Sequence, residues 1–199
     1  DEIISSILNH STFDSSKSNI VRAFQDSFIN YQSSISDLLW DYDCKHDHLI
    51  ESYLNNNLIA FLDSIMIYDL ETKVNFVIDH GIDLNKPDIS GDYCLGHAIY
   101  TRNEPLSLAL IKSEKIDLKK KIPIKNTESE YTSYLHIAIE YKMENVASVL
   151  ISDKSFDINI TDSIGETPLM CACRNRSLDC INNLFERNDL DYQHKNNNN

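Results

Sequence analysis

The sequence contains few of the residues that interrupt helices. Glycine and proline occur four times each among 199 residues, and none of them lies within the first 80. A stretch without these residues that still shows a helical spacing of apolar side chains is expected to be helical. Four glycines in the whole chain also argue against a glycine-rich loop that binds phosphate.

The sequence also lacks a long apolar run and an excess of positive charge. No stretch of about 18 residues is uniformly apolar, so we expect no membrane-spanning segment. The net charge is −13, from 31 acidic and 18 basic residues, and it opposes binding to nucleic acid or to an anionic membrane surface. The charge is compatible with a basic protein partner, although a soluble acidic surface is the simpler interpretation.

The five cysteines show no pattern of a disulfide framework, because their number is odd and their spacing is irregular. We therefore expect reduced thiols and a cytoplasmic or nuclear protein. No signal or transit peptide is visible, although the first residue is Asp1 and not methionine.

The first 57 residues are predicted to form an N-terminal helical segment. Apolar residues at intervals of three and four predict one long helix from Ser18 to about Trp40. A polar turn is expected next, followed by a helix through residues 49–54. The run Asn55–Asn57 is expected to separate that helix from another one through residues 58–65.

This segment, residues 1–57, has more than one predicted role. Residues 1–17 are expected to contain a short helix, and the whole segment either caps the part that follows or has a function of its own. The apolar stripe of the long helix is predicted to be a face for self-association or to fold back on the chain. The stripe consists of Ile20, Phe24, Phe28, Tyr31, Ile35 and Leu38.

An internal repeat occupies the rest of the chain. An Asp flanked by apolar residues recurs at intervals of 34, 40 and 34 residues, and a leucine and an alanine recur at intervals of 40 and 34. Independent markers that share one insertion indicate a real repeat. The insertion lies within residues 119–131 and is polar enough to be a lengthened loop. The markers are Asp83, Asp117, Asp157 and Asp191, then Leu95, Leu135 and Leu169, then Ala98, Ala138 and Ala172.

Each repeat unit is predicted to consist of two short helices and a turn. In the third unit, Leu135, Ala138 and Ile139 belong to the first helix, and Val146 and Leu150 belong to the second. One such pair cannot cover its own apolar face, so the units are expected to stack on one another.

The repeat unit resembles the ankyrin repeat. The best match comprises Asp162, Gly165, Thr167-Pro168-Leu169 and Ala172, and the preceding unit keeps Leu135-His136-Ile137-Ala138. The resemblance implies an all-α fold, an ankyrin-repeat solenoid of helix-turn-helix units with hairpin loops.

The resemblance covers residues 58–199 and implies about four units, of which residues 58–81 form a degenerate first one. The family pattern has histidine where this chain has Gly96 and Met170, and it has proline at Cys94. The last residues match the beginning of a further hairpin, so the array is expected to continue beyond residue 199.

The sequence offers little for a catalytic, cofactor or metal site. Cys44–His48 contains metal-ligand residue types, but they share one side only in an extended segment, so a polar turn is the preferred interpretation. The resemblance implies that His136 hydrogen-bonds the backbone of the neighbouring hairpin. Cys171 and Cys173 are expected to be buried, inert thiols. We therefore predict no enzymatic activity, no cofactor and no metal.

A protein-binding surface follows from the resemblance, which implies contacts through hairpin tips and through the concave face of the first helices. Aromatic and Arg side chains often anchor protein interfaces. We therefore predict that Tyr100, Tyr141 and Arg174 form a ladder with one step per unit, the alternative being ordinary solvated side chains. The predicted partner-binding residues are Ile89, Ser90, Asp92, Tyr100, Thr101, Tyr131, Thr132, Glu140, Tyr141, Ser163, Ile164, Glu166, Arg174 and Asn175.

The sequence therefore predicts a protein–protein interaction scaffold or adaptor. One alternative is the substrate-presenting part of a larger enzyme whose catalytic module lies outside this chain. A second alternative is a structural self-association module that uses the N-terminal helices. The repeat does not identify the partner, because one fold serves many functions.

Overall fold

A computed structural model describes residues 17–30, 32–64, 70–124 and 130–197. These residues form ten helices and two short strands, which confirms the predicted all-α fold. The chain divides into two compact units, unit 1 (residues 1–91) and unit 2 (residues 92–199), and each is described by itself. The short helix expected within residues 1–17 lies in a part that is not described, apart from its last residue.

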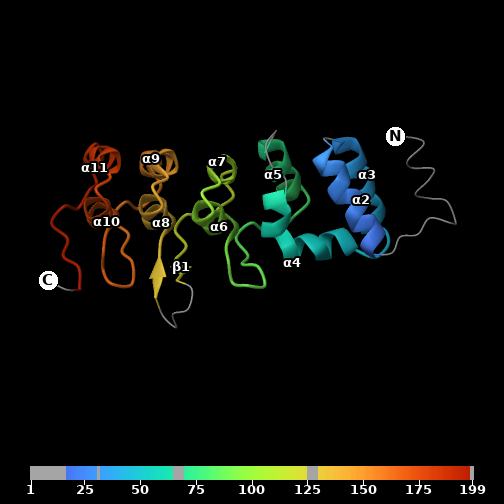
Figure 1. Cartoon of the computed structure of the whole chain (residues 1–199), viewed down its shortest axis with the longest axis horizontal. Coiled ribbons are helices and arrows are strands. Elements are labelled where there is room, and N and C mark those ends of the chain that lie inside the picture. The colour runs from blue at the N-terminus through green and yellow to red at the C-terminus, as the bar shows by residue number, and fades with distance from the viewer. Residues whose placement is uncertain (1–16, 31, 65–69, 125–129, 198–199) are drawn as a thin grey trace. The chain divides into compact units, whose positions relative to one another are not determined.

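Unit 1 consists of helices that surround an aromatic core (Figure 1). The helices are α2 (Lys17–Ile29), α3 (Ser33–Cys44), α4 (Leu49–Ser64) and α5 (Leu70–Asp79). Helix α2 packs against both α3 and α4. The ring of Phe24 stacks on that of Phe61 at a centroid distance of 5.9 Å, and Phe28 meets Phe76 edge-on at 4.7 Å. Aromatic packing therefore brings α2, α4 and α5 together.

The long helix predicted from Ser18 to Trp40 is instead two helices, α2 and α3. The chain turns at Gln32, whose backbone N–H donates to the carbonyl of Ser27 at 2.9 Å. The hydroxyl oxygens of Ser27 and Ser36 then lie 2.7 Å apart in the buried contact between the two helices. The prediction was wrong because both helices face one core, so the apolar spacing continues across the turn.

The apolar stripe of α2 belongs to the core of unit 1. Ile20, Phe24 and Phe28 are only 1%, 0% and 5% exposed. The stripe therefore folds back on its own unit, which was one of its two predicted roles. These side chains are not available as a face for self-association.

Helix α4 joins the two helices that the asparagine run was expected to separate. The run produces a kink in place of a break, because Asn57 has the non-helical angles φ −133° and ψ 27°. The side-chain amide of Asn57 donates to the carbonyl of Tyr53 at 3.0 Å. The boundary predicted after residue 57 thus falls at a kink within a helix of unit 1.

A buried carboxylate begins α4. Asp43, at the end of α3, is 2% exposed. Its carboxylate accepts hydrogen bonds from the backbone N–H groups of Leu49 at 2.9 Å and Ile50 at 2.7 Å. The first N–H groups of a helix have no partner within the helix, so Asp43 satisfies two of them. The sequence had predicted only a polar turn at this point.

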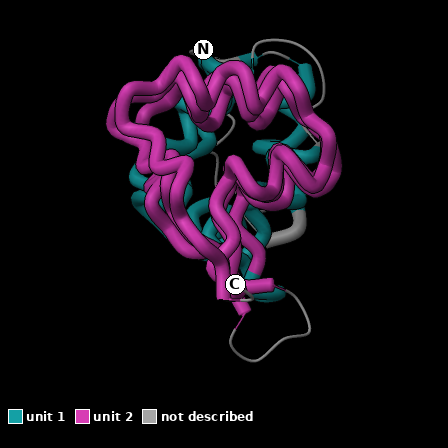
Figure 2. The backbone as a smooth tube through the Cα atoms, turned by 90° about the vertical axis from the view of Figure 1, so that its left-hand side faces the viewer, with its two compact units in different colours: residues 1–91 teal, residues 92–199 magenta. Residues whose placement is uncertain are grey.

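Unit 2 is a stack of three helix pairs (Figure 1). The pairs are α6 (Cys94–Tyr100) with α7 (Glu104–Lys112), α8 (Tyr134–Glu140) with α9 (Glu144–Ser152), and α10 (Pro168–Asn175) with α11 (Leu178–Phe185). Helix α8 packs against α6 and α10, and α9 packs against α7 and α11. Figure 2 views unit 2 with these pairs one behind another and with their connecting loops gathered on one side. Each pair thus covers the next, as the repeat predicted.

The recurring Asp has the same role in every unit. Its side-chain Oδ1 accepts a hydrogen bond from the backbone N–H two residues further on, which closes a local turn. The four pairs are Asp83 with Asn85 (2.8 Å), Asp117 with Lys119 (3.1 Å), Asp157 with Asn159 (2.9 Å) and Asp191 with Gln193 (2.9 Å). The spacing of the marker in the sequence therefore reports a repeated turn.

The insertion forms a short antiparallel hairpin of β1 (Ile122–Pro123) and β2 (Tyr131–Thr132). Ile122 pairs with Thr132, and Pro123 pairs with Tyr131. The side chain of Ile122 is 3% exposed, so the insertion contributes to the core of unit 2. The prediction of a purely polar loop is corrected on this point.

A buried tyrosine lies next to the insertion and faces Gly96. A Cβ atom added to Gly96 would meet Cγ2 of Ile122 and Cε1 of Tyr134, both at 3.8 Å. Tyr134 is fully buried, and this burial raises the pKa of its phenol well above the ordinary value. Gly96 stands where the ankyrin pattern has histidine. The side chains of Ile122 and Tyr134 thus occupy the space that a histidine there would need.

Candidate protein-interaction surface

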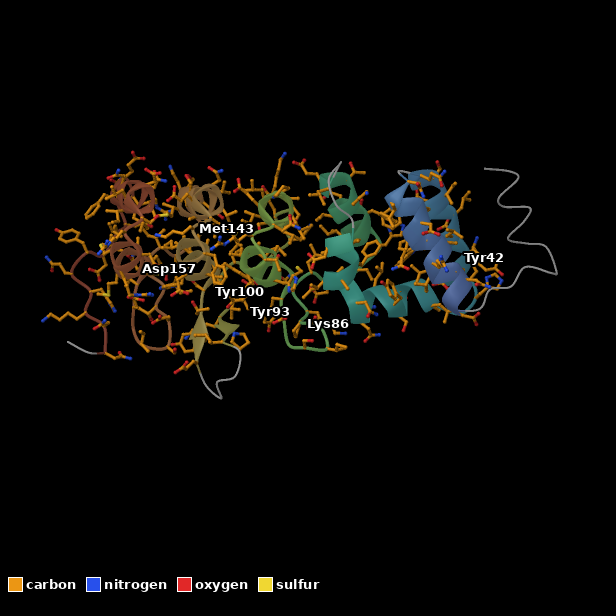
Figure 3. All side chains as sticks on the ribbon, in the orientation of Figure 1. Tyr42, Lys86, Tyr93, Tyr100, Met143 and Asp157 are labelled. Carbon is orange, nitrogen blue, oxygen red and sulfur yellow. The ribbon has the colours of Figure 1, made fainter. Side chains whose placement is uncertain are left out.

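The ends of the first helices in unit 2 bring two predicted residues into contact. Tyr100, labelled in Figure 3, lies at the end of α6, and Tyr141 directly follows α8. Their rings meet edge-on at a centroid distance of 5.1 Å. Desolvation, together with the neighbouring Tyr141, raises the pKa of Tyr100 to about 12, so its hydroxyl stays neutral at physiological pH. The two half-buried rings form one continuous aromatic surface.

The third member of the predicted ladder, Arg174, is held between two carboxylates. Its guanidinium donates to both carboxylate oxygens of Glu166, at 3.1 and 2.8 Å, and to Glu140 at 2.9 Å. These hydrogen bonds, that to Glu166 first, raise the pKa of Arg174 further above its ordinary value. Glu140 comes from the preceding unit, so the pair joins α8 to α10. We call Tyr100, Glu140, Tyr141 and Arg174 the first-helix surface.

Two further predicted residues support this surface from its edge. The side-chain amide of Asn175 donates to the carbonyl of Cys171 at 2.9 Å, and the hydroxyl of Thr101 donates to the carbonyl of His97 at 2.9 Å. The ammonium of Lys142 donates to the backbone carbonyl of Asn175 in the next unit. These bonds fix the ends of the first helices relative to one another.

The predicted hairpin tips differ in their surroundings. In unit 1, Ile89 is 83% exposed, and Ser90 beside it is also exposed. In unit 2, Asp92 and Ser163 are half-buried and Ile164 is exposed. Their use in binding stays a prediction.

Tyr131 lies where the insertion meets the next hairpin. Its ring carries the ammonium of Lys121, which lies 4.0 Å from the ring centroid. Its backbone carbonyl accepts a hydrogen bond from the N–H of Ser163 at 3.0 Å. The half-buried Tyr131 therefore also connects successive hairpins.

Two of the predicted contact residues are buried. Thr132 is 8% exposed within the β-hairpin, and Glu166 is 7% exposed beneath Arg174. The backbone N–H of Glu166 donates to Asp162 at 2.8 Å, and its carboxylate is committed to Arg174. Both residues support the surface and do not belong to its exposed part, which corrects the prediction.

His136 has the structural role that the resemblance implied. Its Nε2 lies 2.9 Å from the backbone carbonyl of Glu166 in the next unit, and its Nδ1 lies 2.8 Å from the hydroxyl of Ser133. A carbonyl only accepts, so Nε2 carries the proton and Nδ1 accepts from Ser133. Desolvation lowers the pKa of His136, which keeps the ring neutral.

The other reactive side chains fall into separate places. The ring of His46 bonds the carbonyl of Tyr42 at 2.7 Å, whereas His48 bonds Glu51 at 3.2 Å. No group of three or more His, Cys, Asp or Glu side chains suited to a metal ion occurs in the described ranges. Cys171 is buried, and desolvation raises its pKa to about 12. Cys173 is exposed, contrary to expectation, because no described helix covers that side of α10.

The sequence did not reveal Arg187, which joins the last two helix pairs. Its guanidinium donates to the carbonyls of Ile151 at 2.6 Å, Asp153 at 2.8 Å and Phe156 at 3.2 Å. It also pairs with Asp189 through two hydrogen bonds of 2.8 and 2.7 Å. The only available signal was a change of charge, because the repeat register places Arg187 opposite Asp153.

Stacked helix pairs joined by hairpin loops, with a repeat of 34 to 40 residues, define a helical-repeat protein. Residues 118–197 match the family described as ankyrin repeats (3 copies), and through this part the chain belongs to the ankyrin-repeat family. Ankyrin repeats are in general protein–protein interaction modules. A comparison with the curated proteins gives no match. No helix in the described part is long and apolar enough to cross a membrane.

Proposed function

We propose that unit 2 is a recognition module of a scaffold or adaptor protein and binds its partner through the first-helix surface. The supporting observation is the continuity of this surface across three units. Tyr100 contacts Tyr141, and Glu140 contacts Arg174, so residues from successive first helices touch each other. Aromatic and Arg side chains held in fixed positions lose little entropy on binding, which favours them as anchors.

The proposal includes no catalytic role and no cofactor. The ring nitrogens of His136 are both engaged in hydrogen bonds, and the thiol of Cys171 has a raised pKa of about 12. Both side chains are buried in the contact between α8 and α10, where they support packing. The free thiols and the acidic charge support a cytoplasmic or nuclear location as part of the same proposal.

The test is affinity capture with the 199-residue chain and its Tyr100→Ala/Tyr141→Ala variant. Arg174 is left in place because its removal would leave the buried carboxylate of Glu166 without its partner. We expect the variant to lose about tenfold or more of the captured partner, as two anchor residues account for at least about 1.4 kcal/mol.

The matched control is Asn182→Ala/Glu186→Ala, which changes two exposed positions at the end of α11. Circular dichroism and thermal unfolding establish that both variants are folded. Equal loss of the partner by both variants, or capture unaffected by the tyrosine variant, would contradict the assignment of the first-helix surface.

A further inference from the structure

The contact between α9 and α11 contains a complete binding site for a guanidinium group. Arg187 donates to the backbone carbonyls of Ile151, Asp153 and Phe156 from the preceding unit. Asp189 adds two hydrogen bonds in a fork, and the side chain of Arg187 is only 11% exposed. We call this arrangement the Arg187 site.

The repeat register identifies the equivalent place one unit earlier. An offset of 40 residues relates α9 to α7, so Ile151 and Phe156 correspond to Ile111 and Ile116. An offset of 34 residues relates the last pair to the one before it, so Arg187 corresponds to Asp153. The equivalent place therefore has the same backbone, but a carboxylate stands where the Arg187 site has its guanidinium.

This equivalent place is an open groove of about 630 Å³. We call it the Asp153 groove, and its lining includes Ile111, Ile116, Asp153 and Ser155, which are counterparts of the residues that form the Arg187 site. In Figure 1 it belongs to the ends of α7 and α9 and the loops that follow them. The groove is the Arg187 site without its arginine.

The charge of the Asp153 groove is negative. Glu114, Asp117 and Asp153 contribute three carboxylates, against the two ammonium groups of Lys112 and Lys119. The cation at the Arg187 site comes from within the chain, whereas position 153 reverses that charge. The groove thus has an unfilled volume, carbonyl acceptors and a net negative charge in the same place.

We propose that the Asp153 groove binds an arginine side chain of the partner protein. The guanidinium would lie as that of Arg187 does, donating to the carbonyls of Ile111 and Ile116 and pairing with the carboxylate of Asp153. A planar guanidinium has several donors in a fixed fork and suits acceptors on different sides, whereas an ammonium is a single point charge. The proposal rests on the proposed function for its biological meaning, because it names the chemistry of the partner.

The direct test is a titration of the isotope-labelled 199-residue chain with N-acetyl-arginine-N-methylamide, followed by amide NMR. We expect saturable shifts of amides in residues 111–119 and 153–156, with a dissociation constant on the order of 1 mM for so small a probe. The citrulline analogue has nearly the same shape without the charge, and it is expected to cause no shifts there.

Two variants keep the test decisive. Asp153→Arg/Ser155→Asp reproduces Arg187 and Asp189 at the equivalent positions, so it should fill the groove from within, abolish the shifts and raise the melting temperature. Asp153→Asn keeps the local hydrogen-bond acceptor and removes only the charge, so it should weaken the binding of the probe by about threefold or more.

Three results would overturn the proposal. They are the absence of shifts, equal shifts with the citrulline analogue, and unchanged binding of the probe by Asp153→Asn. The outcome is separate from that of the affinity capture. A captured partner with no arginine-dependent shifts would leave the scaffold function standing and remove the groove, whereas shifts without a captured partner would do the reverse.

Discussion

At the scale of single residues, His136 connects two units through its two ring nitrogens. The arrangement needs the neutral ring, because Nδ1 accepts from Ser133 while Nε2 donates to the carbonyl of Glu166. Desolvation lowers the pKa of His136, so the folded protein takes up this proton at a lower pH than the unfolded chain, whose histidines titrate near about 6.5. Folding is therefore linked to pH through this residue.

The stability contributed by His136 should be complete above about pH 6.5 and should fall as the pH drops from there through the lowered pKa of the folded protein. In that window the unfolded state binds more protons, and one group changes the free energy of unfolding by at most about 1.4 kcal/mol per pH unit. Urea denaturation of the natural chain and of His136→Gln, repeated between pH 8 and pH 5, measures the difference. Since the chain has seven histidines, only the difference between the two proteins isolates this one. A difference that stays constant across the range would refute the linkage.

At the scale of elements, the beginning of α4 depends on a residue from the preceding helix. The carboxylate of Asp43 accepts from two backbone N–H groups of α4 and is buried. Removal of its side chain leaves those two donors without partners in a place that water reaches poorly. The contact thereby links α3 and α4 as well as ending the turn between them.

Asp43→Ala is expected to lower the free energy of unfolding by about 1–2 kcal/mol, the usual cost of losing a side-chain cap. Asp43→Asn keeps one acceptor oxygen and should lose less. Urea denaturation followed by circular dichroism gives the values, and Asp41→Ala, at an exposed position in the same helix, is the control. A loss no greater than that of the control would show that the cap is not significant.

The elements show how far the sequence determines the fold. The repeated pairs of unit 2 were predictable because each helix has its own short apolar pattern and the Asp turns mark the boundaries. The turn at Gln32 was not predictable, because the helical period is the same on both sides and the contact of Ser27 with Ser36 exists only after folding. The cap by Asp43 was missed for a similar reason, since six residues separate Asp43 from Leu49.

The site was predictable in position but not in its interactions. The register located Tyr100, Glu140, Tyr141 and Arg174 at the ends of the first helices. It did not show that Glu166 is buried, because that burial results from its fork with Arg174. Bonds of this kind depend on the directions of long side chains, which residue spacing alone does not determine.

At the scale of the whole molecule, stability in unit 2 is passed between neighbouring pairs. In repeat proteins each pair contacts only the next, so the contacts at each junction decide which pairs open first. The junction of α9 with α11 has Arg187, and near it the side-chain amide of Asn159 donates to the carbonyl of Asp189 at 2.7 Å. The last pair is therefore held mainly by packing and by these polar groups.

Arg187→Ala should destabilise the last helix pair by about 2 kcal/mol, since it removes charge-assisted bonds to buried carbonyls. Arg187→Lys should recover only part of this loss, because an ammonium cannot reproduce the fork. Amide hydrogen exchange is the appropriate measurement, with faster exchange expected in α10 and α11 and little change in unit 1. Equal acceleration throughout the chain would contradict a local role for Arg187.

The contact of Gly96 with Tyr134 has a consequence for how this protein diverges over time. A glycine in one unit and a large ring in the next fill one space, so neither position is free to change alone. A mutation that restored histidine at 96 would be selected against until 134 had become small. Descendants of this gene should therefore inherit these two residues as a pair, and the hairpin that contains Ile122 should be gained or lost with them.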